Sequence, residues 1–208
     1  MQRNRYRLVN HPIIVAGTFL ALAGILVYGV PGLIPPLRAE KAASGKVLTP
    51  QQAGGEVEVL RDVAALPPQV ARMRGAILQA AMSGNVEALR VPIDMNELPP
   101  MLAKEKVGDP MEHWRKVSGD GEGREVMAAL VQLFRTGFAR KDGGTDRETY
   151  VWPYFAEMPL DKLTPAQEVE ILTLVPPARL KAMREKGKYD WYRLTIASDG
   201  TWHSFMQE

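Results

Sequence analysis

One long uncharged segment near the start constrains this chain more than any other feature. Residues 13–34 contain no charged side chain, and Arg3, Arg5 and Arg7 precede them. As a helix that rises 1.5 Å per residue, the segment would be about 33 Å long, enough to cross a hydrocarbon core of ~30 Å. The sequence therefore predicts a membrane helix or signal segment at 13–34, after a short basic cytoplasmic N-terminus at 1–12.

The charges around this segment predict its orientation. Positive residues are retained in the cytoplasm, so the chain after residue 34 is expected on the other side of a bacterial inner membrane, in the periplasm. Whether the segment stays as an anchor is open. Its apolar run exceeds the ~7–15 residues of a signal-peptide core, whereas Leu37-Arg38-Ala39 resembles an imperfect cleavage site. In both cases the membrane is the first predicted partner.

The positive net charge of the chain comes from its N-terminal residues and not from the part expected to be exported. Four of the 26 basic residues and none of the 24 acidic ones lie in residues 1–39, which leaves 22 basic and 24 acidic residues beyond them. A chain without a basic surface gives no indication of nucleic-acid binding. Cysteine is absent, which excludes disulfides, thiolate nucleophiles and cysteine metal sites.

Composition divides the remainder into two parts. Residues 35–66 are rich in proline and glycine and predict a stalk or linker, in which residues 56–64 could form a short helix or an edge strand, and residues 67–208 predict one exported domain. Helical spacing of apolar residues, proline starts and glycine ends indicate several helices in this domain. The predicted helices cover residues 68–83, 85–90, 94–103, 109–117, 125–138, 165–175 and 178–186. The Thr164 capping box opens one of them, with Val169, Ile171, Leu172 and Val175 on its buried face.

Strands are expected between these helices and at the end of the chain. Residues 136–156 predict two strands around Gly143-Gly144, and residues 189–206 predict a hairpin around Asp199-Gly200. With a two-residue turn, His203 lies opposite Ile196 on the inward face, whereas a longer loop would exchange the two faces. The predicted class is α+β, with helices packed on a small antiparallel sheet that ends in a β-hairpin.

Aromatic residues concentrate in the last third of the chain. Alternation along a strand would place Trp152 and Tyr154 on one face, and exposed Tyr and Trp are typical of binding surfaces. One interpretation is an aromatic sheet face that binds a partner or ligand. The other is that the helices at 164–186 cover this face and make the aromatic residues core. The candidate binding residues are Trp152, Tyr154, Trp191, Trp202 and His203.

Residues 149–208 also resemble a known family. The run V-W-P-Y-F at 151–155, the helix start L-T-P-A-Q-E-V-E at 163–170 and D-G-T-W at 199–202 are similar to the C-terminal part of an uncharacterised family of exported proteins from alpha-class proteobacteria. The resemblance implies an exported or membrane-tethered protein. It implies no activity and no site residues.

No catalytic motif accompanies these features. The G-x-S-x-G nucleophile elbow and the paired histidines of a zinc helix are both missing, so no catalytic residue, metal or cofactor is predicted. The leading hypothesis is a membrane-tethered envelope protein with a non-enzymatic binding or accessory role and an envelope protein as partner. Two alternatives stay open: a pocket protein or acid–base enzyme with His203 in a cavity, and an accessory subunit that uses helix 13–34 as its interface.

Overall fold

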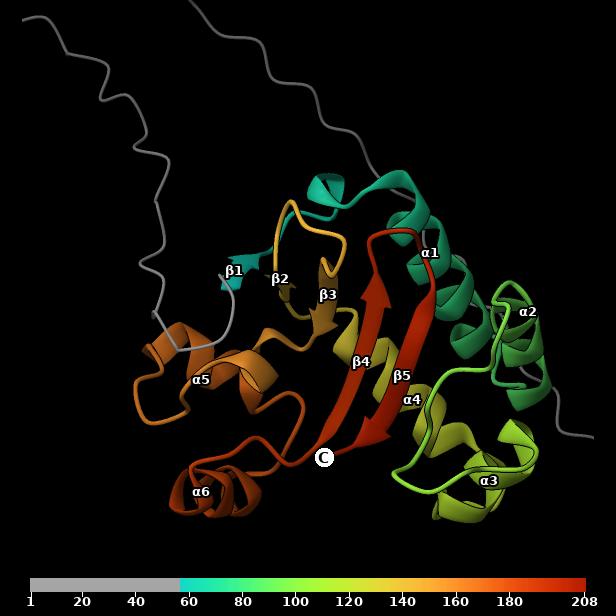
Figure 1. The fold of residues 1–208 in the computed structure, drawn as a ribbon. Helices are drawn as coiled ribbons and strands as arrows, with labels where there is room; N and C mark the ends of the chain where they lie inside the picture. Colours follow the sequence, from blue (N-terminus) through green and yellow to red (C-terminus); the bar gives the residue numbers. More distant parts are fainter. Residues whose placement is uncertain (1–56) are drawn as a thin grey trace, which may run out of the picture. The chain divides into compact units, whose positions relative to one another are not determined.

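The computed structural model describes residues 57–208, which fold into one α+β unit (Figure 1). The predictions for 1–12, 13–34 and the stalk up to residue 56 lie outside the described residues. Within residues 57–208, none of the helices combines the length and the apolarity needed to span a bilayer. The helices are α1 (Pro68–Met82), α2 (Arg90–Asp94), α3 (Pro110–Val117), α4 (Arg124–Leu133), α5 (Pro165–Ile171) and α6 (Pro177–Lys186), with 3-10 turns at η1 (Val63–Ala65), η2 (Val86–Leu89) and η3 (Tyr154–Glu157).

The strands form a five-stranded antiparallel sheet in chain order. They are β1 (Val57–Leu60), β2 (Phe138–Lys141), β3 (Thr149–Trp152), β4 (Tyr192–Ala197) and β5 (Trp202–Gln207). The predicted architecture of helices on an antiparallel sheet with a C-terminal hairpin is thus confirmed. One boundary differs: β1 lies inside the predicted stalk 35–66 and pairs with β2, so the domain begins before residue 67.

Helices cover both faces of this sheet, and each face has its own core. The larger core joins α1, α3 and α4 to Tyr150, Trp152, Leu194 and Ile196 of the strands. The smaller core joins η3, α5 and α6 to Ala139 and Val151 on the opposite face. Figure 1 shows α5 and α6 apart from α1–α4, on the other side of the strands. Because side chains alternate along a strand, a sheet buried on both faces can bury nearly every apolar residue it carries.

Helix ends with a strong local signal lie where the sequence predicts them. Pro67 precedes α1, and Gly84 follows it with a positive φ of 72°, the conformation in which glycine ends helices. Thr164 and Gln167 form the predicted capping box of α5. Gly187 ends α6 with a φ of 65°. These ends depend on neighbouring residues alone, which is why the sequence reveals them.

Other helix predictions are wrong in their extent. The helix predicted at 85–90 is the 3-10 turn η2, followed directly by α2, and Pro92 lies in the first turn of α2, where a missing N–H costs no hydrogen bond. Residues 95–101 form turns and a short bridge to β5 instead of a helix. The helix predicted over 125–138 ends at Leu133 and is followed by a turn in which the Thr136 N–H and hydroxyl both donate to the Leu133 carbonyl, at 3.0 and 2.7 Å.

The buried side of α5 also differs from the prediction. Ile171 and Val175 are buried against the smaller core, whereas Val169 and Leu172 are exposed. Ile171 and Val175 are four residues apart and therefore lie on the same side of a helical turn. Val169 and Leu172 lie on a neighbouring side. A helix as short as α5 buries only one such stripe, which is narrower than the predicted face.

A bulge in the C-terminal hairpin decides which side chains face the core. The predicted register holds from the Tyr192–Gln207 pair to the Thr195–Ser204 pair. Beyond it the register shifts, and Ile196 pairs with Trp202 rather than with His203. One extra residue in a strand exchanges its faces. The prediction that His203 faces inward is therefore wrong: Trp202 is fully buried and His203 is exposed.

Residues 96–101 run beside β5 and cover the first part of its outer edge. The Asn96 side chain donates to the Trp202 carbonyl at 2.9 Å and accepts from the Trp202 N–H at 3.1 Å. The Met101 N–H donates to the His203 carbonyl at 2.8 Å, and the Phe205 N–H donates to the Met101 carbonyl at 2.9 Å. Asn96 thus satisfies the backbone groups that the bulge releases from the ladder.

Replacing Asn96 by alanine is expected to lower the free energy of unfolding by about 1–3 kcal/mol, because the Trp202 N–H and C=O would lose their partners. Urea unfolding monitored by tryptophan fluorescence measures the loss. Asn85→Ala is the matched control, since Asn85 makes a single exposed capping bond to Glu87, of about 1 kcal/mol. An Asn96→Ala effect no larger than that of the control would contradict this role.

Candidate functional site

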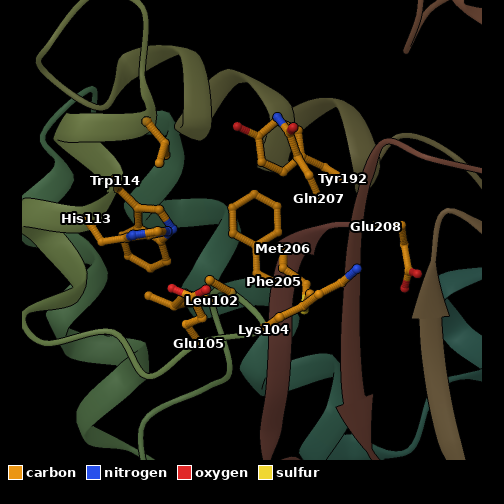
Figure 2. A pocket seen from close by; sticks show the side chains of 12 residues that line it. Leu102, Lys104, Glu105, His113, Trp114, Tyr192, Phe205, Met206, Gln207 and Glu208 are labelled. Carbon is orange, nitrogen blue, oxygen red and sulfur yellow. The ribbon is translucent and has the colours of Figure 1, made fainter.

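An open groove between α3 and the end of β5 is the best candidate site in the described part of the chain. Its volume is about 430 Å³. In Figure 2, His113 and Trp114 lie on one side, Tyr192, Phe205 and Gln207 on the other, and Glu105 at the lower edge. We call it the α3–β5 groove; its walls are Leu102, Ala103, Lys104, Glu105, His113, Trp114, Val117, Tyr192, Phe205, Met206, Gln207 and Glu208.

The α3 wall is set by a strong helix start. The Asp109 carboxylate accepts hydrogen bonds from the N–H groups of Met111 and Glu112 at 2.8 and 3.0 Å, and Pro110 occupies the first helical position. This start confirms the helix predicted at 109–117. It fixes the rotation of α3, which buries Trp114 and leaves Val117 exposed at the rim.

The floor of the groove is backed by three packed aromatic rings, each at most 6% exposed. Trp114 lies 6.2 Å from Phe205, and Phe205 stacks on Tyr192 at 5.1 Å with 23° between the ring planes. Tyr192 and Phe205 reach the same side because both belong to the core-facing set of the β4–β5 hairpin. The floor is thus apolar and is assembled from α3 and the C-terminal hairpin, which are distant in sequence.

Charged groups surround this floor. Burial, followed by the charge of Lys116, lowers the pKa of His113, so its imidazole is neutral at pH 7 and can donate one hydrogen bond and accept another. Burial opposes ionisation of Glu208, but hydrogen bonds from Arg193 and Lys188 hold the pKa of Glu208 below its ordinary value. Lys104 and Glu105 add one charge of each sign. The groove therefore offers apolar contact inside and polar contact at the rim.

Three of the predicted site residues are core residues. Trp152 packs against Phe134 and Phe138. Trp202 stacks on Trp114 at 6.1 Å, and its ring N–H donates to the Ser204 carbonyl. All three, Trp152, Tyr154 and Trp202, are buried, and none of them lines the α3–β5 groove.

Tyr154 also departs from the predicted strand face. It lies in η3, after the end of β3, and belongs to the smaller core on the opposite side of the sheet from Trp152. Its hydroxyl donates to Glu170 at 2.9 Å and accepts from Arg61 at 3.0 Å. Burial, and then the Glu170 hydrogen bond, raise the pKa of Tyr154. Helices therefore bury all three residues, but only Tyr154 lies in the core of the helices at 164–186, as the second interpretation proposed; Trp152 and Trp202 lie in the larger core with α1, α3 and α4.

The other two predicted residues are accessible but separate. Trp191 is partly exposed, and the Arg179 guanidinium lies 4.3 Å from the centre of its ring. His203 is exposed on the bulge and does not line the α3–β5 groove. The five candidates therefore do not form a single site. The groove residues His113 and Trp114 lacked a signal, because only the fold brings 113–114 to 192 and 205.

A second cluster of titratable groups lies at the β2–β3 turn. The buried Glu148 carboxylate accepts hydrogen bonds from Arg140 at 2.8 Å, from the Gly144 N–H at 2.5 Å and from the Tyr150 hydroxyl at 2.5 Å. The Arg140 bond is the leading cause of a Glu148 pKa of about 2, and burial is the leading cause of a Tyr150 pKa of about 12. With its bonds made to the protein itself, Glu148 holds the turn together instead of presenting a reactive group.

Metal-binding geometry is not found in residues 57–208, where no three His, Asp or Glu side chains lie close enough to share an ion. Comparisons of the chain with protein-family models, with curated proteins and with solved structures found no match.

Proposed function

We propose that this protein is a membrane-tethered envelope protein with a non-enzymatic role, and that it binds a partner through the α3–β5 groove. One observation carries the proposal: a groove of about 430 Å³ is backed by the packed rings of Trp114, Phe205 and Tyr192, with the exposed Val117 and several charges at its rim. Tyr and Trp are enriched where proteins bind one another. The proposal places the binding surface in this groove instead of on the aromatic sheet face.

The tether follows from the N-terminal sequence. The uncharged segment 13–34, the preceding arginines and the resemblance of 149–208 to exported proteins support an inner-membrane anchor or signal, with the groove in the periplasm. In spheroplasts, a tag fused after Glu208 is expected to react with an impermeant label. Labelling only after lysis would contradict the tether. Helix 13–34 as an interface to a membrane complex is compatible with the same arrangement.

The lining of the groove favours binding over catalysis. It contains no serine, threonine or cysteine, and its only hydroxyl is that of Tyr192. One observation nevertheless favours a second candidate function, a small-molecule site: His113 and Glu105 line the same groove, and a neutral histidine is a common general base. In that function His113 takes the place that the sequence suggested for His203.

A charge at the rim is expected to disrupt binding. Val117→Asp places a carboxylate beside the apolar floor, and we expect it to weaken partner binding by about 10- to 100-fold, which corresponds to ~1.4–2.7 kcal/mol. Val169→Asp is the matched control: Val169 is a valine on α5, 68% exposed against 48% for Val117, and not part of the groove. A photo-crosslinking residue at position 207 in intact cells measures partner binding. Equal crosslinking in both variants would exclude the groove as the binding surface.

A further inference from the structure

The geometry points to an extended peptide segment as the occupant of the α3–β5 groove, paired with the outer edge of β5 as an added strand. The inference rests on the proposed function and specifies its partner. Strand addition obtains affinity from main-chain hydrogen bonds and selectivity from pockets for alternate side chains. The α3–β5 groove has features that correspond to both the main-chain bonds and the side-chain pockets.

The outer edge of β5 already accepts an added strand within this chain. Met101 forms a parallel bridge to Ser204, with its N–H bonded to the His203 carbonyl and its C=O bonded to the Phe205 N–H. This pairing shows that the edge is open to a parallel neighbour and that Phe205 points its backbone groups away from β4. The bridge consists of a single residue and ends there.

Beyond Met101 the neighbour leaves the edge while β5 continues. A parallel ladder would next use the Phe205 carbonyl and the Gln207 N–H, which point outward because Phe205 and Gln207 alternate with the pairs that bond to β4. The Glu208 N–H bonds to the Trp191 carbonyl, which confirms that alternation. By the same alternation the Gln207 N–H points away from β4, because Gln207 pairs with Tyr192 two positions after the Leu194–Phe205 pair. The groove lies where the ladder would continue, between residues 102–105 and residues 205–208.

The floor defines the side chains of the occupant. A strand beside β5 directs every second side chain to the face that carries Phe205, where the half-exposed Val117 and the buried floor rings line the groove. The intervening side chains face the other side of the sheet, where Met206 is partly exposed. The occupant is therefore a segment with apolar residues at alternate positions and with free N–H groups where it pairs.

The length of the free edge argues against a second copy of the chain. Residues 205–207 span about 10 Å, or roughly three residues at ~3.4 Å each, whereas strands in sheets usually contain about 5–6 residues. Residues 102–105 form the wall opposite this edge. A single extended segment can enter such a gap, but symmetric pairing of two β5 edges would be limited to those three residues.

A synthetic peptide, Lys-Thr-Val-Thr-Val-Thr-Lys, tests the pairing. It is titrated into the full-length protein in detergent, with amide NMR shifts as the readout, together with two analogues that are N-methylated on the valines or on the threonines. Only one of these sets of N–H groups can face β5. We therefore expect shifts at Gln207 and at least tenfold weaker binding for one analogue than for the other. Equal binding of the two analogues, or no binding of the parent peptide, would overturn the inference.

Variants of the edge separate this inference from the proposed function. Gln207→Pro removes the outward N–H and is expected to weaken peptide binding at least tenfold, whereas Gln207→Ala keeps the N–H and should bind like the wild type. Unchanged binding by Gln207→Pro would contradict strand addition. If the peptide fails while Val117→Asp still abolishes the crosslink, the groove binds a partner of another kind. Dimerisation that shifts the Gln207 amide without peptide would identify a second copy as the occupant.

Discussion

Replacing Trp202 by alanine is expected to lower the free energy of unfolding by about 3–5 kcal/mol, among the largest effects of any single truncation in this domain. Trp202 is fully buried, stacks on Trp114 and donates its ring N–H to the Ser204 carbonyl. The truncation would leave a large cavity between α3 and the hairpin and one carbonyl without its donor. Urea unfolding followed by far-UV circular dichroism measures the loss.

Two further substitutions make this result interpretable. Trp202→Phe keeps most of the ring volume and should cost only about half as much. Trp191→Ala removes a partly exposed tryptophan at the start of the same hairpin, and we expect a loss below about 2 kcal/mol. A Trp202→Ala protein as stable as the wild type but defective in binding would contradict the core role. It would restore the interpretation of Trp202 as a binding residue.

Replacing Glu148 by glutamine is expected to cost about 2–3 kcal/mol at pH 7. The carboxylate accepts hydrogen bonds from Arg140, Gly144 and Tyr150. Glutamine is neutral and has one acceptor oxygen instead of two, so it cannot replace these charge-assisted bonds. Since the pKa of Glu148 falls from 4.5 in the unfolded chain to about 2 in the fold, its contribution is complete above pH 4.5. The contribution is lost as the pH falls from about 4.5 to 2.

The pH dependence distinguishes this carboxylate from its neighbours. Wild-type stability should fall between pH 5 and pH 2.5 by more than that of Glu148→Gln, and the difference between the two should shrink as the pH decreases. Glu58→Gln is the control, because Glu58 approaches the same Arg140 at 3.6 Å but is half exposed, which limits its contribution to ~0–1 kcal/mol. A difference that stays constant with pH would show that Glu148 does not titrate as described.

The parts of the fold that follow from short stretches of sequence are predictable. The capping box at Thr164, the glycines after α1 and α6 and the Asp109-Pro110 start of α3 each act within four residues, so the sequence reveals the helix boundaries. The helix–sheet class follows from the change of apolar period from helical spacing to alternation. The strand pair 138–152 and the C-terminal hairpin are predictable for the same reason.

Which of Trp202 and His203 faces the core cannot be read from the residues next to them in the sequence. The turn residues Asp199-Gly200 predict a regular hairpin, but Asn96 holds the Trp202 backbone from more than a hundred residues away and stabilises the bulge. The bulge that accompanies these contacts places Trp202 inward and His203 outward, the reverse of the prediction. The same limit applies to the α3–β5 groove: alternation along the hairpin places Tyr192 and Phe205 on one face, but no pattern in the sequence connects them with Trp114.

The order of the strands has a consequence for how the domain assembles. β2 to β5 join neighbours that are close along the chain, apart from the α5–α6 excursion, whereas β1 pairs with β2 across all of α1–α4. Closing so long a loop around one four-residue strand has a high entropic cost and returns few hydrogen bonds. We expect β1 to join the sheet late in folding and to detach first when the native state opens locally. β1, the first strand of the domain, would then also be the strand whose amides are least protected from hydrogen exchange.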